Sequence, residues 1–273
     1  MKGMKNTIKQ LLPPVLLGII RSLSRTKYGW YGNYESWNEV KSKTTWYDNE
    51  IIVKKVADSA LKVKKGEAVY ERDSVIFDKI QYSWPLLAGL MYVAARKGGK
   101  LSVLDFGGSL GTTYFQNRKF FFGLNIEWSI VEQKHFVEFG NKNIADDKLK
   151  FYESIDCCLK EHSPDVVILS TVLQYLESPY TFLNELLGYN FEFILIDRTP
   201  FTLNNTDRLT IQKVPPTIYN ASYPCWFFSE TKFITSISKK YELVEFFDSS
   251  IKANIPSIFK GFIFVIKENR NSG

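Results

Sequence analysis

The chain has 273 residues, of which 45% are hydrophobic and 23% are charged. This composition is that of one large or two small globular domains, and it excludes a disulfide-stapled mini-protein and an intrinsically disordered chain. Three cysteines and two histidines are too few soft ligands for a structural zinc site, so we expect no metal. The low cysteine content is typical of a reduced, cytoplasmic protein.

The net charge of +6 is confined to the N-terminus. Residues 1–30 contain six lysines and arginines and no acid, so the rest of the chain is neutral. A nucleic-acid-binding protein more often spreads its basic residues over the surface that follows the phosphates. We therefore expect no nucleic-acid partner.

An apolar run of ten residues, LLPPVLLGII at 11–20, lies within this basic stretch. It is shorter than the roughly 20 residues that span a bilayer, and no signal-peptide cleavage site follows it. Two interpretations stay open for residues 1–27. Residues 1–25 form an interfacial helix that makes peripheral contact with the inner face of a membrane, or they form a helix that packs on the protein's own body.

Residues 28–100 form an accessory region that is rich in aromatic side chains. We expect an aromatic loop over 28–50 that leads into a helix near 50–64, and we favour packing of these rings on the protein's own core over ligand stacking. Apolar residues at helical spacing over 74–96, interrupted at Pro85, predict a kinked helix or two helices before the first strand.

From residue 101 onwards, short apolar runs alternate with helical stretches, which is typical of parallel sheets. Five strands are predicted at 101–106, 127–133, 148–153, 165–170 and 191–198, with helices at about 113–121, 135–143, 154–162 and 178–188. Two further strands, 241–250 and 261–268, are joined by a loop too short for a helical crossover and should pair antiparallel at the sheet edge. Residues 101–273 thus predict an α/β, doubly wound, Rossmann-like domain with a seven-stranded, mostly parallel sheet. Residues 202–230 are a long insertion after strand five, which predicts a lid or a binding wall.

The strongest motif is VLDFGGSLGTTYF at 103–115. Its glycines allow a sharp turn and close approach of a ligand at the start of a helix, which indicates a nucleotide-type site. The spacing matches neither the dinucleotide fingerprint nor the P-loop.

This motif resembles the first motif of class I S-adenosylmethionine-dependent methyltransferases, Asp-x-Gly-x-Gly-x-Gly. Asp105, Gly107 and Gly111 match it, and Ser109 replaces the middle glycine. The acid that the family uses at the end of strand two to bind the ribose hydroxyls corresponds to Glu132. The resemblance implies S-adenosyl-L-methionine as the cofactor. The residues that it assigns to cofactor binding are Asp105, Gly107, Gly108, Ser109, Gly111, Glu132, Gln133, Glu153, Ser154, Ile155 and Ser170.

Four further segments, at 32–37, 71–84, 197–201 and 218–229, resemble methyltransferases encoded with bacterial surface-polysaccharide biosynthesis genes. This resemblance implies O-methylation of a sugar or glycan acceptor. The alternative is a catalytically inactive, methyltransferase-like binding or scaffold subunit of such a pathway. A nucleotide-sugar oxidoreductase would need the dinucleotide glycines and a Tyr-x-x-x-Lys pair, neither of which is visible.

The candidate catalytic residues follow from their places at the strand ends. Asp197 and His135 are the candidate bases, and Tyr175 is a candidate for orienting the acceptor. An ion pair with Arg198 or Arg208 is the structural alternative for Asp197, and a surface position at a helix start is the alternative for His135. The candidate substrate-binding residues are Gln174, Arg198, Arg208, Tyr219, Tyr223 and Trp226, for which a self-packed aromatic cap is the alternative.

Overall fold

The computed structural model describes residues 27–45, 49–216, 218 and 221–268. The basic apolar segment, with its two alternative interpretations, lies outside the described residues, and so does Tyr219. Among the described helices, none has the length and apolarity needed to cross a membrane.

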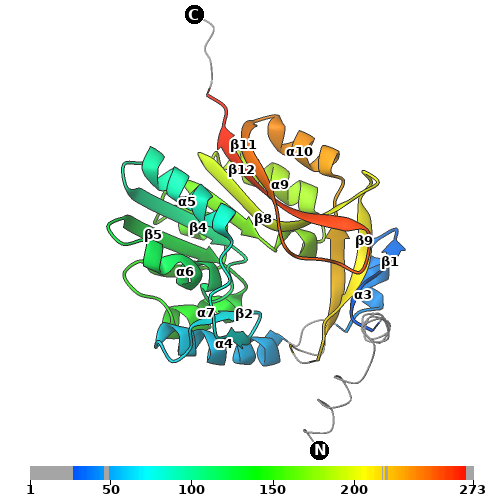
Figure 1. Ribbon diagram of the computed structural model, residues 1–273, viewed down its shortest axis with the longest axis horizontal. Helices are drawn as coiled ribbons and strands as arrows, with labels where there is room; N and C mark the ends of the chain where they lie inside the picture. Colours follow the sequence, from blue (N-terminus) through cyan, green and yellow to red (C-terminus); the bar gives the residue numbers. More distant parts are fainter. Residues whose placement is uncertain (1–26, 46–48, 217, 219–220, 269–273) are drawn as a thin grey trace, which may run out of the picture.

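A seven-stranded sheet forms the centre of the molecule, in the order β11-β12-β8-β7-β4-β5-β6 (Figure 1). Its strands are β4 (Lys100–Phe106), β5 (Asn125–Val131), β6 (Leu149–Tyr152), β7 (Val166–Ser170), β8 (Phe193–Thr202), β11 (Tyr241–Asp248) and β12 (Ser257–Ile266). The pairs among β4 to β8 are parallel, and β12 runs antiparallel to both of its neighbours. The predicted Rossmann-like, mostly parallel sheet with an antiparallel C-terminal strand is confirmed.

Helices cover both faces of this sheet because successive residues of its strands point to opposite faces and both sets are apolar. Val103 belongs to the core on one face and Leu104 to the core on the other. The first core includes residues of α4 (Asn49–Lys64), α5 (Trp84–Arg96), α6 (Thr112–Asn117) and α7 (Lys134–Asn143). The second includes residues of α8 (Ile155–Leu159), α9 (Pro179–Gly188) and α10 (Glu230–Ser238). Two short turns of 3-10 helix, η1 (Arg118–Phe120) and η2 (Leu173–Tyr175), complete this domain.

The prediction of helix from residue 74 is wrong for its first part. Residues 70–77 form a hairpin of β2 (Tyr70–Arg72) and β3 (Val75–Phe77), and α5 begins only at Trp84. Asp73 and Ser74 both have positive φ, of 53° and 65°, as a two-residue hairpin turn requires. Pro85 lies in the first turn of α5, where proline starts a helix instead of kinking it.

The predicted aromatic loop and the predicted insertion loop together form a second sheet. Its strands are β1 (Gly29–Tyr34), β9 (Arg208–Lys213) and β10 (Ser222–Phe227), in the antiparallel order β1-β9-β10. We call it the lid sheet, and Figure 1 shows it beside the central sheet near the end of β8. Short α3 (Trp37–Ser42) packs on it through Trp37, which stacks on Trp226.

Candidate functional site

A cavity of about 840 Å³ lies at the carboxyl ends of the central strands, between these ends and the lid sheet. Residues that end or follow β4, β5 and β7 line one side, and residues of β1, β9 and β10 line the other. Its volume is within the range of small-molecule sites, which in open α/β sheets lie at this edge.

The glycine loop after β4 has no room for side chains at two positions. Gly107 has a φ of +72°, and a Cβ there would lie 2.6 Å from Cγ2 of Val172. A Cβ at Gly108 would lie 2.7 Å from Oδ2 of Asp105. Both glycines line the cavity, so a ligand can approach the backbone of this loop closely.

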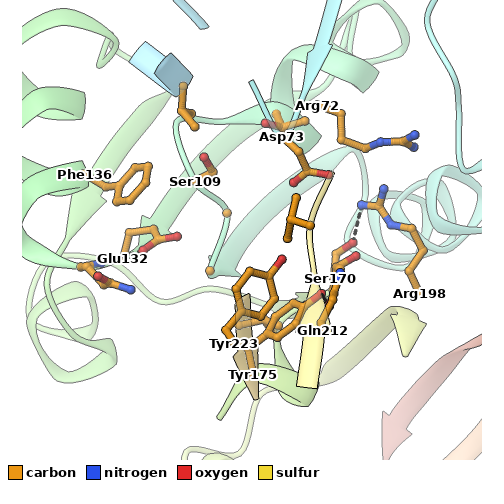
Figure 2. Close-up of a pocket in the computed structure, with 18 of the residues that line it drawn as sticks. Arg72, Asp73, Ser109, Glu132, Phe136, Ser170, Tyr175, Arg198, Gln212 and Tyr223 are labelled. Atoms are coloured by element: carbon orange, nitrogen blue, oxygen red, sulfur yellow. Dashed lines mark hydrogen bonds between the residues drawn. The ribbon is translucent and has the colours of Figure 1, made fainter. Parts of the chain in front are cut away.

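Glu132 follows β5, and its carboxylate projects into the cavity opposite this loop (Figure 2). Its Oε2 accepts a hydrogen bond from the backbone N–H of Gln133 at 2.7 Å. Burial raises the pKa of this carboxyl, and backbone hydrogen bonds from Gln133 and Ser109 act in the opposite direction. Phe136 and Glu153 extend this side of the cavity.

Asp105 lies in β4 behind the glycine loop and is only 1% exposed. Its Oδ2 accepts a hydrogen bond from Nε1 of Trp128 at 3.3 Å. Burial raises the pKa of Asp105 to about 7, which the hydrogen bond from Trp128 opposes and the charge of Glu132 reinforces. This carboxyl therefore changes its charge near neutral pH at the base of the glycine loop.

The side chain of Asp197 is also 1% exposed and is not among those that line the cavity. Its Oδ2 lies 3.2 Å from Nε of Arg198, and it accepts hydrogen bonds from Ser83 at 3.4 Å and Ser170 at 3.5 Å. Burial raises the pKa of Asp197 and the charge of Arg198 opposes this rise. The ion pair with Arg198 that we weighed against a catalytic role is present, and Arg198 is the member of the pair that lines the cavity.

Four non-glycine residues that line the cavity have left-handed backbone conformations. They are Asp73, Ser109, Thr171 and Arg198, with φ of 53°, 54°, 58° and 54°. Such conformations cost about 1–3 kcal/mol each and concentrate at functional sites, where the surrounding structure maintains them. Four of the seven non-glycine residues with positive φ in the described part of the chain thus line one cavity.

Aromatic and amide side chains form the wall on the lid side. The hydroxyl of Tyr175, at the end of η2, donates to Oε1 of Gln212 at 2.9 Å. The ring of Tyr223 meets that of Tyr175 edge to face at 5.1 Å. Tyr28 and Trp30 of the N-terminal region line the same cavity.

Most of the residues predicted from the sequence come together here. Those that line the cavity are Asp105, Gly107, Gly108, Ser109, Glu132, Gln133, Glu153, Ser170, Tyr175, Arg198 and Tyr223.

The other predicted residues take structural positions next to it. Gly111 precedes α6 with a φ of +95°, Ser154 caps α8, and Ile155 lies in the core. The amide Nε2 of Gln174, which is buried, donates to the carbonyl of Arg198 at 3.5 Å.

Three predicted residues lie away from the cavity wall. His135 is exposed near the start of α7. Arg208 donates from Nε to the carbonyl of Gly32 at 2.9 Å, which ties β9 to β1. Trp226 stacks on Trp37 with ring centroids 6.5 Å apart.

Sequence patterns missed a further set of cavity residues, among them Arg72, Asp73, Phe136, Gln212 and Lys213. Arg72 and Asp73 come from a hairpin whose second strand lies in the stretch that we predicted as helix, and Gln212 and Lys213 come from β9 in the predicted loop. The Asp-Ser turn at 73–74 is the signal that could have indicated the hairpin.

No protein-family model matches this chain, and no curated protein matches it. Among solved structures it is similar to the N-terminal domain of EvdMO1 in the presence of S-adenosylhomocysteine and D-fucose, with 11% identity, a TM-score of 0.47 and coverage of 81% of this chain and 98% of that one. It is similar to magnesium protoporphyrin IX methyltransferase from Synechocystis with bound S-adenosylmethionine, with 10% identity, a TM-score of 0.46 and coverage of 82% and 99%.

A third similar structure is 1,6-didemethyltoxoflavin-N1-methyltransferase from Burkholderia thailandensis with bound S-adenosylhomocysteine. It has 12% identity, a TM-score of 0.45 and coverage of 88% of this chain and 94% of that one. At this distance the similarity assigns neither cofactor nor substrate to the present chain.

Proposed function

We propose that this protein is an S-adenosylmethionine-dependent methyltransferase that O-methylates a sugar or glycan intermediate. The observation that carries the proposal is the meeting of two features in one cavity. The glycine loop at 107–108 and the carboxylate of Glu132 face the same space at adjacent strand ends. The sequence resemblance relates the same two features to that cofactor.

The residues present fit such a cofactor. Gly107 and Gly108 line the cavity, and a Cβ at either would collide with Val172 or Asp105, so the loop offers bare backbone to a ligand. Glu132 would accept hydrogen bonds from the ribose hydroxyls, and Phe136 and Glu153 would border the adenine. The methyl group that this cofactor supplies when bound is transferred to a nucleophilic oxygen or nitrogen by displacement at carbon.

The residues on the lid side suit a polyhydroxylated acceptor. Tyr175 and Tyr223 offer ring faces and hydroxyls, and the amide of Gln212 offers hydrogen-bonding atoms between them. Apolar faces with a few fixed polar groups are the usual means by which such sites orient a ligand. The assignment to bacterial surface-polysaccharide biosynthesis rests on the sequence resemblance.

We assign the proton-accepting role to Asp73. An acceptor hydroxyl must lose its proton as its oxygen attacks, and a base must lie within reach of that oxygen. The carboxylate of Asp73 projects into the middle of the cavity (Figure 2). That of Asp197 is buried in contact with Ser170 and Arg198 and does not line the cavity. Asp197 then acts as a positioning residue that holds the guanidinium of Arg198.

Methyl transfer from labelled S-adenosylmethionine to a panel of nucleotide sugars and glycans tests the proposal. We expect Asp73→Asn to lower the single-turnover rate about 10²- to 10⁴-fold with affinity for S-adenosylhomocysteine unchanged. Asp197→Asn should lower the Tm and weaken acceptor binding because it breaks a buried ion pair. Asp78→Asn, an exposed carboxylate outside the cavity wall, is the matched control.

Two outcomes contradict these assignments. If Asp73→Asn keeps the single-turnover rate of the parent while Asp197→Asn loses it at an unchanged Tm, Asp197 is the base. Cofactor binding without transfer to any member of the panel would favour the inactive binding or scaffold subunit.

A further inference from the structure

Among the charged residues that line the cavity, Glu132 and the two arginines lie on opposite sides (Figure 2). Three carboxylates, those of Asp105, Glu132 and Glu153, lie at or after the ends of β4, β5 and β6. The cations Arg72, Arg198 and Lys213 come from β2, β8 and β9. Figure 2 shows Glu132 on one side, Arg72 and Arg198 on the other, and Asp73 between them. The cofactor proposed above would occupy the carboxylate end, which leaves a cationic end for the second ligand.

Arg198 is built rigidly into this cationic end. Asp197 and Arg198 together lie opposite the single residue Gly261 of β12, which is a β-bulge, and bulges next to sites redirect side chains. The left-handed φ of Arg198 accompanies this bulge. Nη2 donates to Oγ of Ser170 at 2.8 Å, and Nε faces Asp197 at 3.2 Å. The Nη1 donors have no partner in the described part of the chain.

Arg72 and Arg198 line the same side of the cavity although 126 positions separate them in the sequence (Figure 2). Burial raises the pKa of Tyr70, and the positive charges of Arg72 and Arg198 both act against this rise. The guanidinium of Arg72 donates from Nη2 to Oε1 of Gln81 at 3.0 Å and lies over the ring of Phe77, with Cζ 5.5 Å from the ring centroid. Asp197 neutralises part of the charge of Arg198, whereas Arg72 forms no ion pair with a carboxylate in the described part of the chain.

We propose that this arginine end, defined by Arg72 and Arg198, binds an anionic group of the acceptor, a phosphate or a carboxylate. Guanidinium groups match both anions because their N–H donors form a planar fork. The inference deepens the proposed function, on which it rests: the acceptor is a phosphorylated or carboxylated sugar and not a neutral one. The competing source of the same chemistry is the carboxylate of the cofactor itself.

Calorimetric titration of inorganic pyrophosphate and of malonate distinguishes these sources. Each is titrated into the free protein and into protein saturated with S-adenosylhomocysteine, at constant ionic strength. We expect one of the two anions to bind both forms with similar affinity. Arg72→Gln and Arg198→Lys should each weaken that binding about tenfold or more, because each removes charge-assisted hydrogen bonds. Arg198→Lys keeps a positive charge beside Asp197, so we expect this variant to fold like the parent.

The matched control is Arg96→Gln, which removes an exposed arginine of α5 outside the cavity and should bind the anion like the parent. Preference for pyrophosphate identifies a phosphate group, and preference for malonate identifies a carboxylate. Displacement of the anion by S-adenosylhomocysteine would assign the arginine end to the cofactor and overturn the proposal. Binding of neither anion, or equal binding by Arg72→Gln, would also overturn it. Failure of S-adenosylhomocysteine to bind contradicts the proposed function instead, and the titration of the free protein still tests the anion site.

Discussion

A buried carboxyl beside the glycine loop has a strongly shifted pKa. Glu71 of β2 is 3% exposed, and its Oε1 accepts a hydrogen bond from the hydroxyl of Thr112, the first residue of α6. Burial raises the pKa of Glu71 from 4.5 to about 7, and the hydrogen bond from Thr112 opposes this rise. Its other oxygen, Oε2, is buried without a hydrogen-bond partner among the described residues.

This pKa shift predicts that the free energy of unfolding of the parent falls with rising pH, and that Glu71→Gln removes the part of this dependence that Glu71 causes. Because the folded-state pKa lies above the unfolded value, Glu71 destabilises the fold progressively as pH rises from about 4.5 to about 7. At about 1.4 kcal/mol per pKa unit, the parent should lose roughly 3 kcal/mol of unfolding free energy relative to the variant over this range. Urea unfolding at pH 5 and pH 8 measures the difference.

Asp105 carries a similar shift but is present in both proteins, so the comparison isolates Glu71. Glu67→Gln, an exposed carboxylate before β2, is the matched control and should follow the parent at both pH values. Parallel stability curves for the parent and Glu71→Gln would contradict the shift.

Single residues could be predicted where their role follows from a local pattern. Asp105, Gly107 and Glu132 were found because a glycine loop and a strand-end acid follow directly from runs of apolar residues. The sequence did not indicate which of Asp197 and Arg198 faces the cavity, because the β-bulge that turns Arg198 toward it depends on pairing with β12. Asp73 was missed because the strand that follows it, β3, lies in the stretch that we predicted as helix, so the hairpin was not recognised.

Among the elements, the central strands were predicted well and the lid sheet was not. Each central strand is a short apolar run bounded by turns, and the terminal hairpin was visible from its short connection. β1, in contrast, becomes a strand through pairing with β9, and Gly32 and Arg208, which join the two, are 176 residues apart. Of its aromatic side chains, Trp30 packs against Phe227 and Phe259 and also lines the cavity.

The outer edge of β1 is held by one side chain. Oδ1 of Asn254 accepts from the N–H of Trp30 at 2.7 Å, and Nδ2 donates to the carbonyl of Trp30 at 2.9 Å. Asn254→Ala removes both hydrogen bonds, so we expect faster amide exchange across 29–34, weaker acceptor binding and unchanged affinity for S-adenosylhomocysteine. Hydrogen exchange with mass spectrometry measures the first effect and calorimetry the last.

Asn204→Ala, at an exposed turn after β8, is the matched control for this experiment and should leave exchange over 29–34 unchanged. Unchanged exchange in Asn254→Ala as well would show that β1 is held by its pairing with β9 alone. Loss of cofactor affinity in that variant would contradict the division of the cavity into two ends.

At the scale of the whole molecule, the cavity joins two parts of different origin. One part is the carboxyl edge of the central sheet, where most cavity residues predicted from the sequence end or directly follow a predicted strand. The other combines β1, the β2–β3 hairpin and the β9–β10 hairpin, which come together only in the folded chain. The side of the cavity at the central sheet could therefore be predicted from local sequence, and most of the side formed by the hairpins and β1 could not.

Calorimetric titration with S-adenosylhomocysteine tests the central claim, that the carboxylate end of this cavity binds the methyl-donor cofactor. The parent should bind. Glu132→Gln should bind roughly 10- to 150-fold more weakly, since it loses charge-assisted hydrogen bonds to the ribose hydroxyls. Glu138→Gln, which changes an exposed carboxylate on α7, should bind like the parent. Absence of binding by the parent, or equal affinity of the parent and Glu132→Gln, would contradict the claim.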